Sequence, residues 1–148
     1  LAFITDAVTG PALRIAPLYK EAINGDAVTI DIMAEDLSNV SGAEILLIFD
    51  ASELAYQSID KGEFFGRAQG QVLEITTLKT SNLLQIDIGA YNGTYPAASG
   101  SGVIATLHFN ALKVGQSALT LQQDCSLRDK DNNVLTYNIL VNGLVDVK

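Results

Sequence analysis

The polar run at residues 129–133, DKDNN, is the part of this chain that comes nearest to a metal-binding pattern. Asp129, Asp131 and Asn133 place side-chain oxygens at alternate positions, as at the start of a calcium loop. Such a loop also needs a glycine at its sixth position and a bidentate acid at its twelfth, where this chain has Val134 and Leu140. We therefore expect a tight polar turn, with a calcium site as the alternative.

Thiol and zinc chemistry have little to build on. Cys125 is the single cysteine and His108 the single histidine, so there is no CxxC pair and no cysteine–histidine ligand set. A lone cysteine cannot form an intramolecular disulfide, and we expect Cys125 to be a buried, unreactive thiol. We expect His108 to be an ordinary exposed strand residue.

Carboxylate catalysis is not indicated either. Asp31, Glu35 and Asp36 have no evident base beside them, and no serine, histidine and aspartate lie in the context of a nucleophile elbow. A glycosidase pair stays open, because a sequence does not reveal carboxylate separations of roughly 5 to 9 Å. We predict that the chain is not an enzyme and that it holds no cofactor and no metal.

Composition narrows the class of protein. A chain of 148 residues with 48% hydrophobic content suits one domain with one sizeable core. The net charge of −8 argues against nucleic-acid binding and against anionic membranes. No run approaches the roughly 18 apolar residues of a membrane span, and the first residues lack the features of a signal peptide. We expect a soluble chain, without membrane insertion, that begins like an excised module.

Alternating hydrophobicity predicts strands along most of the chain. The candidates are residues 12–17, 27–34, 42–50, 54–59, 72–78, 83–91, 102–112, 118–121, 125–127 and 139–147. In residues 102–112 the predicted inward side chains are Val103, Ala105, Leu107, Phe109 and Ala111. About nine strands joined by Gly, Asn and Ser turns favour an all-β fold, a nine-stranded β-sandwich with jelly-roll (Greek-key) topology.

One predicted strand, within VSGAEILLIFD at residues 40–50, is apolar on both faces. Ala43, Ile45, Leu47 and Phe49 share one face, and Glu44, Leu46 and Ile48 share the other. An apolar outer face has to be covered by another part of the chain or by another molecule. The connections at residues 64–71 and 93–101 are long enough to fold over it, so both explanations stay open.

The order of several motifs resembles the bacterial cohesin modules over roughly residues 13–147. The strand ending in Phe49-Asp50 is followed by Leu54 and a segment with Gly62 and Phe64. Then come LLQIDIGAYNG at 83–93, SGSGVIATLHF at 99–109 and NGLVDV at 142–147. The resemblance implies a single cohesin-like domain over residues 1–148, with residues 1–11 as an N-terminal extension or linker remnant.

The resemblance also implies a function. Cohesins are non-catalytic modules that bind a dockerin, a small helical domain whose calcium belongs to the partner and not to this chain. The dockerin-binding face would be built by residues 42–50, 72–78, 83–91 and 102–112. The outward residues that it selects are Glu44, Leu46, Ile48, Leu78, Gln85, Asp87 and Tyr91, with His108 and Thr106 at the edge. The expected setting is extracellular or at the cell surface, in a scaffoldin of a cellulosome-like system for polysaccharide degradation or in another surface protein.

Two other functions stay open at this stage. A carbohydrate-binding module on the same fold is suggested by Tyr91 and Tyr95, which flank an Asn-Gly and present rings that stack on sugars. A structural module of a larger surface protein would instead pack its apolar sheet face on a neighbouring domain or on a second copy, as a homodimer.

Overall fold

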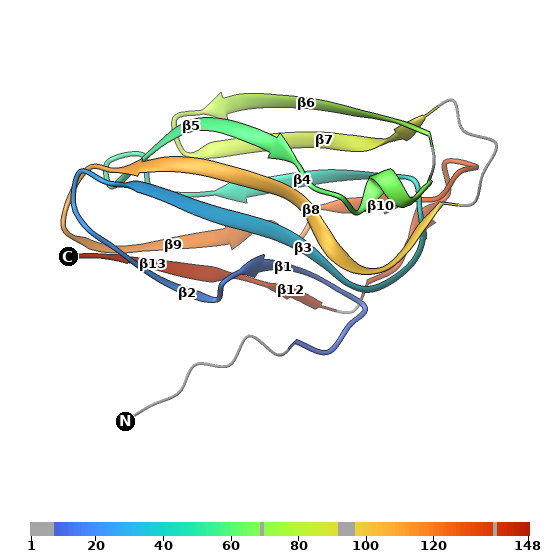
Figure 1. Cartoon of the computed structure of the whole chain (residues 1–148), viewed down its shortest axis with the longest axis horizontal. Helices are drawn as coiled ribbons and strands as arrows, with labels where there is room; N and C mark the ends of the chain where they lie inside the picture. The colour runs from blue at the N-terminus through green and yellow to red at the C-terminus, as the bar shows by residue number, and fades with distance from the viewer. Residues whose placement is uncertain (1–7, 69, 92–96, 138) are drawn as a thin grey trace.

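The structure is a computed structural model that describes residues 8–68, 70–91, 97–137 and 139–148, and these residues form a two-layered β-sandwich (Figure 1). The strands are β1 (Ala12–Ala16), β2 (Tyr19–Ala22), β3 (Ala27–Val40), β4 (Gly42–Ile48), β5 (Leu54–Lys61), β6 (Gln71–Thr80), β7 (Leu83–Tyr91), β8 (Ala98–Ala111), β9 (Gly115–Leu121), β10 (Ser126–Arg128), β11 (Val134–Leu135), β12 (Ile139–Val141) and β13 (Gly143–Val147); a 3-10 helix, η1, spans Phe65–Ala68. The predicted all-β jelly-roll sandwich is confirmed, with thirteen strands among the described residues rather than about nine.

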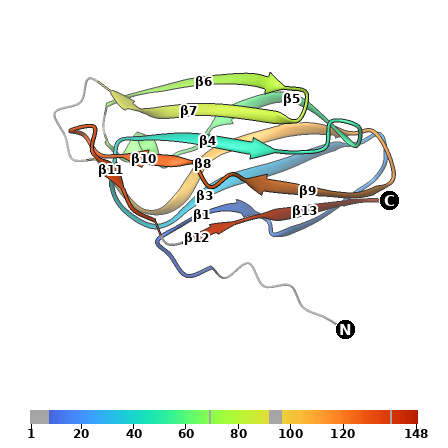
Figure 2. The same ribbon diagram turned by 180° about the vertical axis from the view of Figure 1, so that it is seen from behind.

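The two layers differ in size. One sheet has five strands in the order β12-β1-β3-β8-β5 and faces the viewer in Figure 1. The other has eight strands and is seen from behind in Figure 2. In this larger sheet β4 is central, because β7 pairs with one of its edges while β10 and β9 pair with successive lengths of the other. Strand β6 lies outside β7 and forms the sheet edge.

Strand β4 alternates as its sequence predicts. Ala43, Ile45 and Leu47 are buried, and Phe49, just beyond the strand, packs edge-on against Phe109 of the opposite sheet with ring centroids 5.3 Å apart. Full burial of one such side chain contributes about 1.5–3 kcal/mol. The inward face of β4 is therefore part of the core that joins the two sheets.

The alternation predicted for residues 102–112 is wrong at its start. Ile104 is fully buried, whereas Val103 is only half-buried. The pairing of β3 with β8 shifts between Ile32 and Met33, because Ile32 lies opposite Ala105 and Met33 lies opposite Val103. This bulge places one extra residue in β8 and reverses the inward and outward positions before it.

The segment at residues 139–147 forms two strands in different sheets rather than one. β12 pairs with β1 in the smaller sheet, and β13 pairs with β9 and β2 in the larger sheet. Between them, the Asn142 side-chain oxygen accepts a hydrogen bond from the Leu121 amide at 2.9 Å. A Cβ on Gly143 would lie 2.6 Å from Cγ2 of Ile15, so only glycine fits at this crossing.

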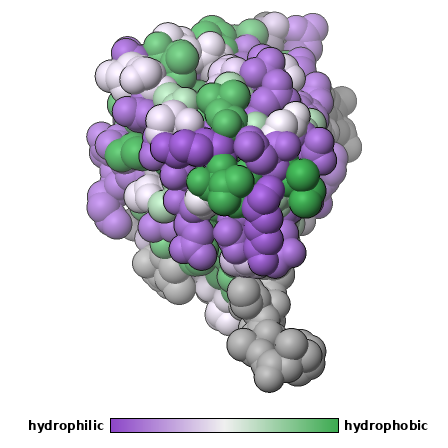
Figure 3. Space-filling view, turned by 90° about the vertical axis from the view of Figure 1, so that its left-hand side faces the viewer, coloured by the Kyte–Doolittle hydropathy of each residue, from purple (hydrophilic) through white to green (hydrophobic). Residues whose placement is uncertain are grey.

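The end of the sandwich that carries the C-terminus has apolar side chains separated by polar ones (Figure 3). Ile23, Leu112 and Val114 are the exposed apolar residues of the turns there. Scattered exposed apolar side chains are ordinary on a protein surface. The single helix among the described residues, η1, is too short to cross a membrane.

A buried ion pair generates a stability prediction. Arg14 Nε lies 2.8 Å from Glu35 Oε1, with side chains only 7% and 15% exposed. Glu35→Ala leaves the guanidinium buried without its counter-ion, and we expect the free energy of unfolding to fall by about 3 kcal/mol in urea titrations. Glu63→Ala removes the partner of Arg67 in an exposed pair and should cost about 0.2–1 kcal/mol. Equal losses in the two variants would contradict this account.

Candidate functional site

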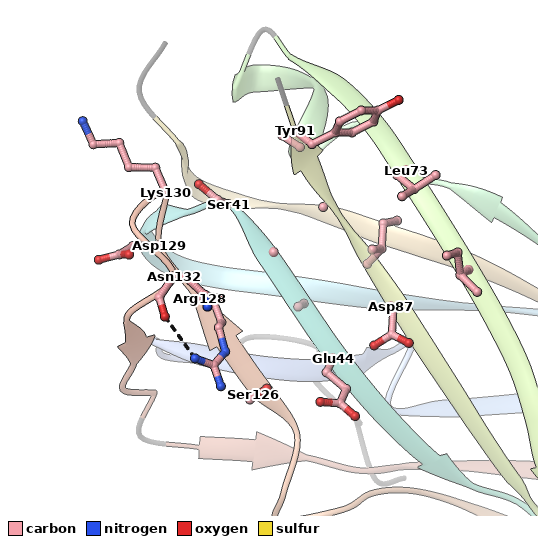
Figure 4. Close-up of a pocket in the computed structure, with 16 residues that line it drawn as sticks. Ser41, Glu44, Leu73, Asp87, Tyr91, Ser126, Arg128, Asp129, Lys130 and Asn132 are labelled. Carbon is pink, nitrogen blue, oxygen red and sulfur yellow. Dashed lines mark hydrogen bonds between the residues drawn. The ribbon is translucent and has the colours of Figure 1, made fainter. Parts of the chain in front are cut away.

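A groove of about 610 Å³ crosses the outward face of the larger sheet (Figure 4). The strands that line it lie at the end of the sandwich opposite the C-terminus, as Figure 2 shows. Four neighbouring strands, β10, β4, β7 and β6, form its floor and one wall, and the loop after β10 forms the other wall. Its lining residues are Ser41, Gly42, Ala43, Glu44, Leu73, Ile75, Asp87, Ile88, Gly89, Ala90, Tyr91, Ser126, Arg128, Asp129, Lys130 and Asn132.

The pairing register arranges the outward side chains in rows that cross the strands. One row runs Ser126, Glu44, Asp87 and Ile75 from β10 to β6. The next row runs Arg128, Gly42, Gly89 and Leu73. Directly opposed residues have Cβ atoms about 4.5–5.5 Å apart. The groove therefore contains two acids, Glu44 and Asp87. The apolar edge strand β6 lies on one side of them, and the basic Arg128 lies on the other side.

Two glycines, Gly42 and Gly89, face each other in the second row and form the floor of the groove between its two walls. We call this pair the glycine floor. Neither residue has a side chain, so half-buried backbone forms the floor of the groove there.

 The two positions differ in what a side chain would meet. A Cβ on Gly89 would lie 2.6 Å from the Ser41 carbonyl oxygen and 2.9 Å from the Gly42 Cα, whereas a Cβ on Gly42 would meet only the Ile88 carbonyl oxygen at 3.7 Å. Close approach of β4 and β7 thus requires glycine at position 89 alone.

The wall on the β6 side is apolar. Leu73 and Ile75 are 50% and 55% exposed, and both point outward from the edge strand. Tyr91 closes this wall at the end of β7, where its hydroxyl donates a hydrogen bond of 2.6 Å to Gln71 Oε1. These three side chains form an exposed apolar surface next to the acids, and Leu73 and Tyr91 are labelled in Figure 4.

The wall on the β10 side is a polar turn. The Asp129 carboxylate accepts hydrogen bonds from the backbone N–H groups of Asn133 and Asp131, both at 2.9 Å, and those from Asn133 above all lower the pKa of Asp129. Arg128 Nη1 donates to the Asn132 carbonyl oxygen at 3.0 Å (Figure 4). The predicted polar turn is confirmed, because the Asp129 carboxylate accepts its hydrogen bonds from residues of the same turn. Across the part of the chain that the structure describes, no three His, Cys, Asp or Glu side chains are grouped to hold a metal ion.

The structure brings most of the predicted partner-binding residues to this face. Glu44, Asp87 and Tyr91 line the groove. Leu46 and Gln85 are cross-strand neighbours in the row beyond Glu44 and Asp87, on the same face. Ile48, 38% exposed, lies at the far end of β4 and lines a second hollow of about 460 Å³.

Two of the predicted partner-binding residues do not lie on this face. Leu78 pairs with Leu84, which is fully buried, so Leu78 is on the core side of the sheet, although on the edge strand β6 it is 51% exposed. His108 lies on β8 in the smaller sheet, where its Nε2 is 2.8 Å from Asp60 Oδ2. The prediction included residues 102–112 in this face, with Thr106 and His108 at its edge, but β8 belongs to the smaller sheet and β10 and β9 pair with β4 instead.

Leu73, Ile75 and Arg128 are among the groove residues that were missed in the sequence. Leu73 and Ile75 belong to QVLEITTLKT, where apolar residues at positions 72, 73, 75 and 78 do not alternate cleanly. The register with Gly89 and Asp87 is what assigns Leu73 and Ile75 to the outward face. Arg128 was missed because β10 is only three residues long, too short for a pattern to show its facing.

The chain's own loops were the alternative cover for the outer face of β4. Phe64 and Phe65, in the connection at residues 64–71, are buried in the core, so this segment packs inward. In the connection at 93–101, positions 93–96, including Tyr95, lie outside the described residues. Leu46 is half-buried and packs against the core, with its amide 3.2 Å from the sulfur of the buried Cys125. The expectation of a buried Cys125 is confirmed, and burial raises the pKa of its thiol.

A family comparison agrees with the two-sheet fold. The model of the cohesin domain matches residues 20–147, so this chain belongs to the cohesin domain family. The predicted resemblance is thereby confirmed. A comparison of the sequence with curated proteins found no match.

Solved structures share the fold at low sequence identity. The chain is similar to a non-cellulosomal cohesin from the hyperthermophilic archaeon Archaeoglobus fulgidus, with 19% identity, a TM-score of 0.76, and coverage of 95% of this chain and 92% of that one. It is similar to the sixth cohesin of scaffoldin B from Acetivibrio cellulolyticus, solved in complex with a Cel5 dockerin mutant, with 19% identity, a TM-score of 0.78, and coverage of 95% and 100%. A type I cohesin from Clostridium thermocellum, solved in the Coh-OlpC-Doc435 cohesin–dockerin complex, has 14% identity, a TM-score of 0.76, and coverage of 100% and 99%.

The unequal surroundings of the two floor glycines generate a prediction. Gly89→Ala forces the new Cβ against the Ser41 carbonyl, and we expect a loss of about 1–3 kcal/mol in the free energy of unfolding. Gly42→Ala meets only ordinary contacts and should be neutral or stabilising by about 0.5–1 kcal/mol, since alanine loses less conformational freedom in a strand. Urea unfolding of both variants measures this difference, and a Gly42→Ala protein as unstable as Gly89→Ala would refute it.

Proposed function

We propose that this cohesin module binds a dockerin domain through the outward face of β10, β4, β7 and β6, and so assembles multiprotein complexes outside the cell or at its surface. The module has no catalytic role in this function, and calcium belongs to the dockerin. The partner is a protein rather than a nucleic acid or a membrane.

The observation that carries the proposal is the exposed apolar wall of the groove. Leu73 and Ile75 are both at least half exposed on a flat sheet face, beside the charged residues Glu44 and Asp87. Apolar side chains at the centre of a patch with charges around them are typical of protein interfaces, where the apolar groups supply affinity and the charges supply specificity. Cohesins of similar fold were solved with dockerins bound, which supports a dockerin as the partner.

Isothermal titration with the dockerin modules of the same genome tests the proposal directly. We expect at least one to bind, and Ile75→Asp to weaken that dockerin by about tenfold to a hundredfold, because burial of an isoleucine contributes about 1.5–3 kcal/mol. Ile75 is 55% exposed, so the substitution should leave folding intact.

The matched control is Ile23→Asp. Ile23 is 61% exposed and lies in the turn after β2, at the opposite end of the sandwich. We expect it to bind like the parent module. If the parent module binds no dockerin, the proposed function is wrong. If Ile75→Asp and Ile23→Asp weaken dockerin binding equally, the dockerin does not bind at the proposed face.

A further inference from the structure

We infer that the hollow over Gly42 and Gly89 receives one long basic side chain, a lysine or arginine, from the helical partner. This inference rests on the proposed function and names the chemistry that the groove selects. It is carried by the shape of the floor, by the apolar wall beside it and by the charges at its end.

The shape of the hollow follows from the row that contains the glycines. Gly42 and Gly89 are cross-strand neighbours, and Arg128 and Leu73 flank them on either side. Two adjacent positions without side chains leave a depression between those flanking residues, within the groove of about 610 Å³. A partner helix lying on the sheet therefore has room for one side chain at this point and not at the neighbouring rows.

The wall and the floor suit an aliphatic stem. Leu73 and Ile75 present exposed apolar surface along the β6 side of the hollow, and Tyr91 closes it. The stems of lysine and arginine bury against apolar surface while their charged ends reach a polar site. A purely aliphatic side chain of the partner would pack against the apolar wall, but it would leave the neighbouring carboxylates desolvated without a counter-charge.

The charges select the head group. Glu44 and Asp87 are directly opposed in the next row, two residues along each strand and therefore about 6.6 Å from the glycines. Among the described residues, the Glu44 carboxylate forms no hydrogen bond or ion pair, and the Asp87 carboxylate accepts one hydrogen bond, from Gln85 Nε2 at 3.0 Å. Like charges placed opposite each other on a sheet are unfavourable, and a cation between them relieves this repulsion.

The basic residues of the other wall set the direction of the incoming side chain. Arg128 is held by the Asn132 carbonyl oxygen, and Lys130 lies on the same turn. The Asp129 carboxylate of this wall accepts hydrogen bonds within its own turn. A cation entering the hollow is therefore repelled by Arg128 and Lys130 and attracted toward Glu44 and Asp87. The basic head group is therefore expected nearer to β7 than to β10.

The first experiment fills the hollow. Gly42→Leu adds a side chain where a Cβ meets only ordinary contacts, and Gly66→Leu makes the same change on η1, outside the groove, where a Cβ meets nothing within 4 Å. With a dockerin that binds the parent, we expect Gly42→Leu to weaken binding at least tenfold and Gly66→Leu to leave it unchanged. Circular dichroism and urea unfolding confirm that both variants fold. If Gly42→Leu binds the dockerin as tightly as the parent does, the inference is wrong, while the proposed function still stands.

The second experiment tests the charge, without a dockerin. The probes are two fluorescein-labelled, stapled amphipathic helices, each with two leucines on one face, that differ only by lysine or glutamate between the leucines. We expect the lysine peptide to bind the parent at least tenfold more tightly, and the paired substitutions Glu44→Lys and Asp87→Lys to reverse this preference. The control Glu21→Lys changes an acid on β2, outside the groove.

The outcomes separate the two claims. Equal binding of the two peptides to the parent, a preference for glutamate, or no binding of either peptide would overturn the basic-anchor inference even if a dockerin binds. A parent module that binds no dockerin but prefers the lysine peptide would support the inference and contradict the proposed function.

Discussion

The pairing of β4 on both of its edges is the constraint on which the rest of the structure depends. Hydrogen bonds to β7 on one side and to β10 and β9 on the other fix the strand in register, so its side chains have to alternate between the core and the outside. A shift by one residue would turn Ile45 and Leu47 outward and bring Glu44 into the core. The apolar inward row therefore determines which residues the module presents.

The groove is a consequence of the same register. Once Gly42 faces Gly89, the hollow lies between Arg128 and Leu73, and the acids fall in the adjacent row. The close approach of backbone at Gly89 excludes any side chain there, so packing between strands and the shape of the outer face are coupled. The groove is built mainly from side chains on paired strands, with the loop after β10 as one wall.

The sequence predicted the elements whose patterns are local. The alternation of residues 42–50 identified Glu44, Leu46 and Ile48 as outward, and the turn around Asp129 followed from its polar residues. The β-bulge that reverses Val103 and Ile104 is not visible in one strand alone, because it arises from the pairing of β3 with β8.

The errors in the candidate site have the same origin. Leu78 was given the wrong facing because the β6–β7 register is set by cross-strand pairing, and His108 was given the wrong sheet because strand order depends on crossovers.

The most direct measurement of the central claim is a two-dimensional NMR titration of the labelled module with a dockerin. The account predicts that shifts concentrate at Gly42, Gly89 and Ile75; shifts centred on the outward face of β8 around His108 would contradict it.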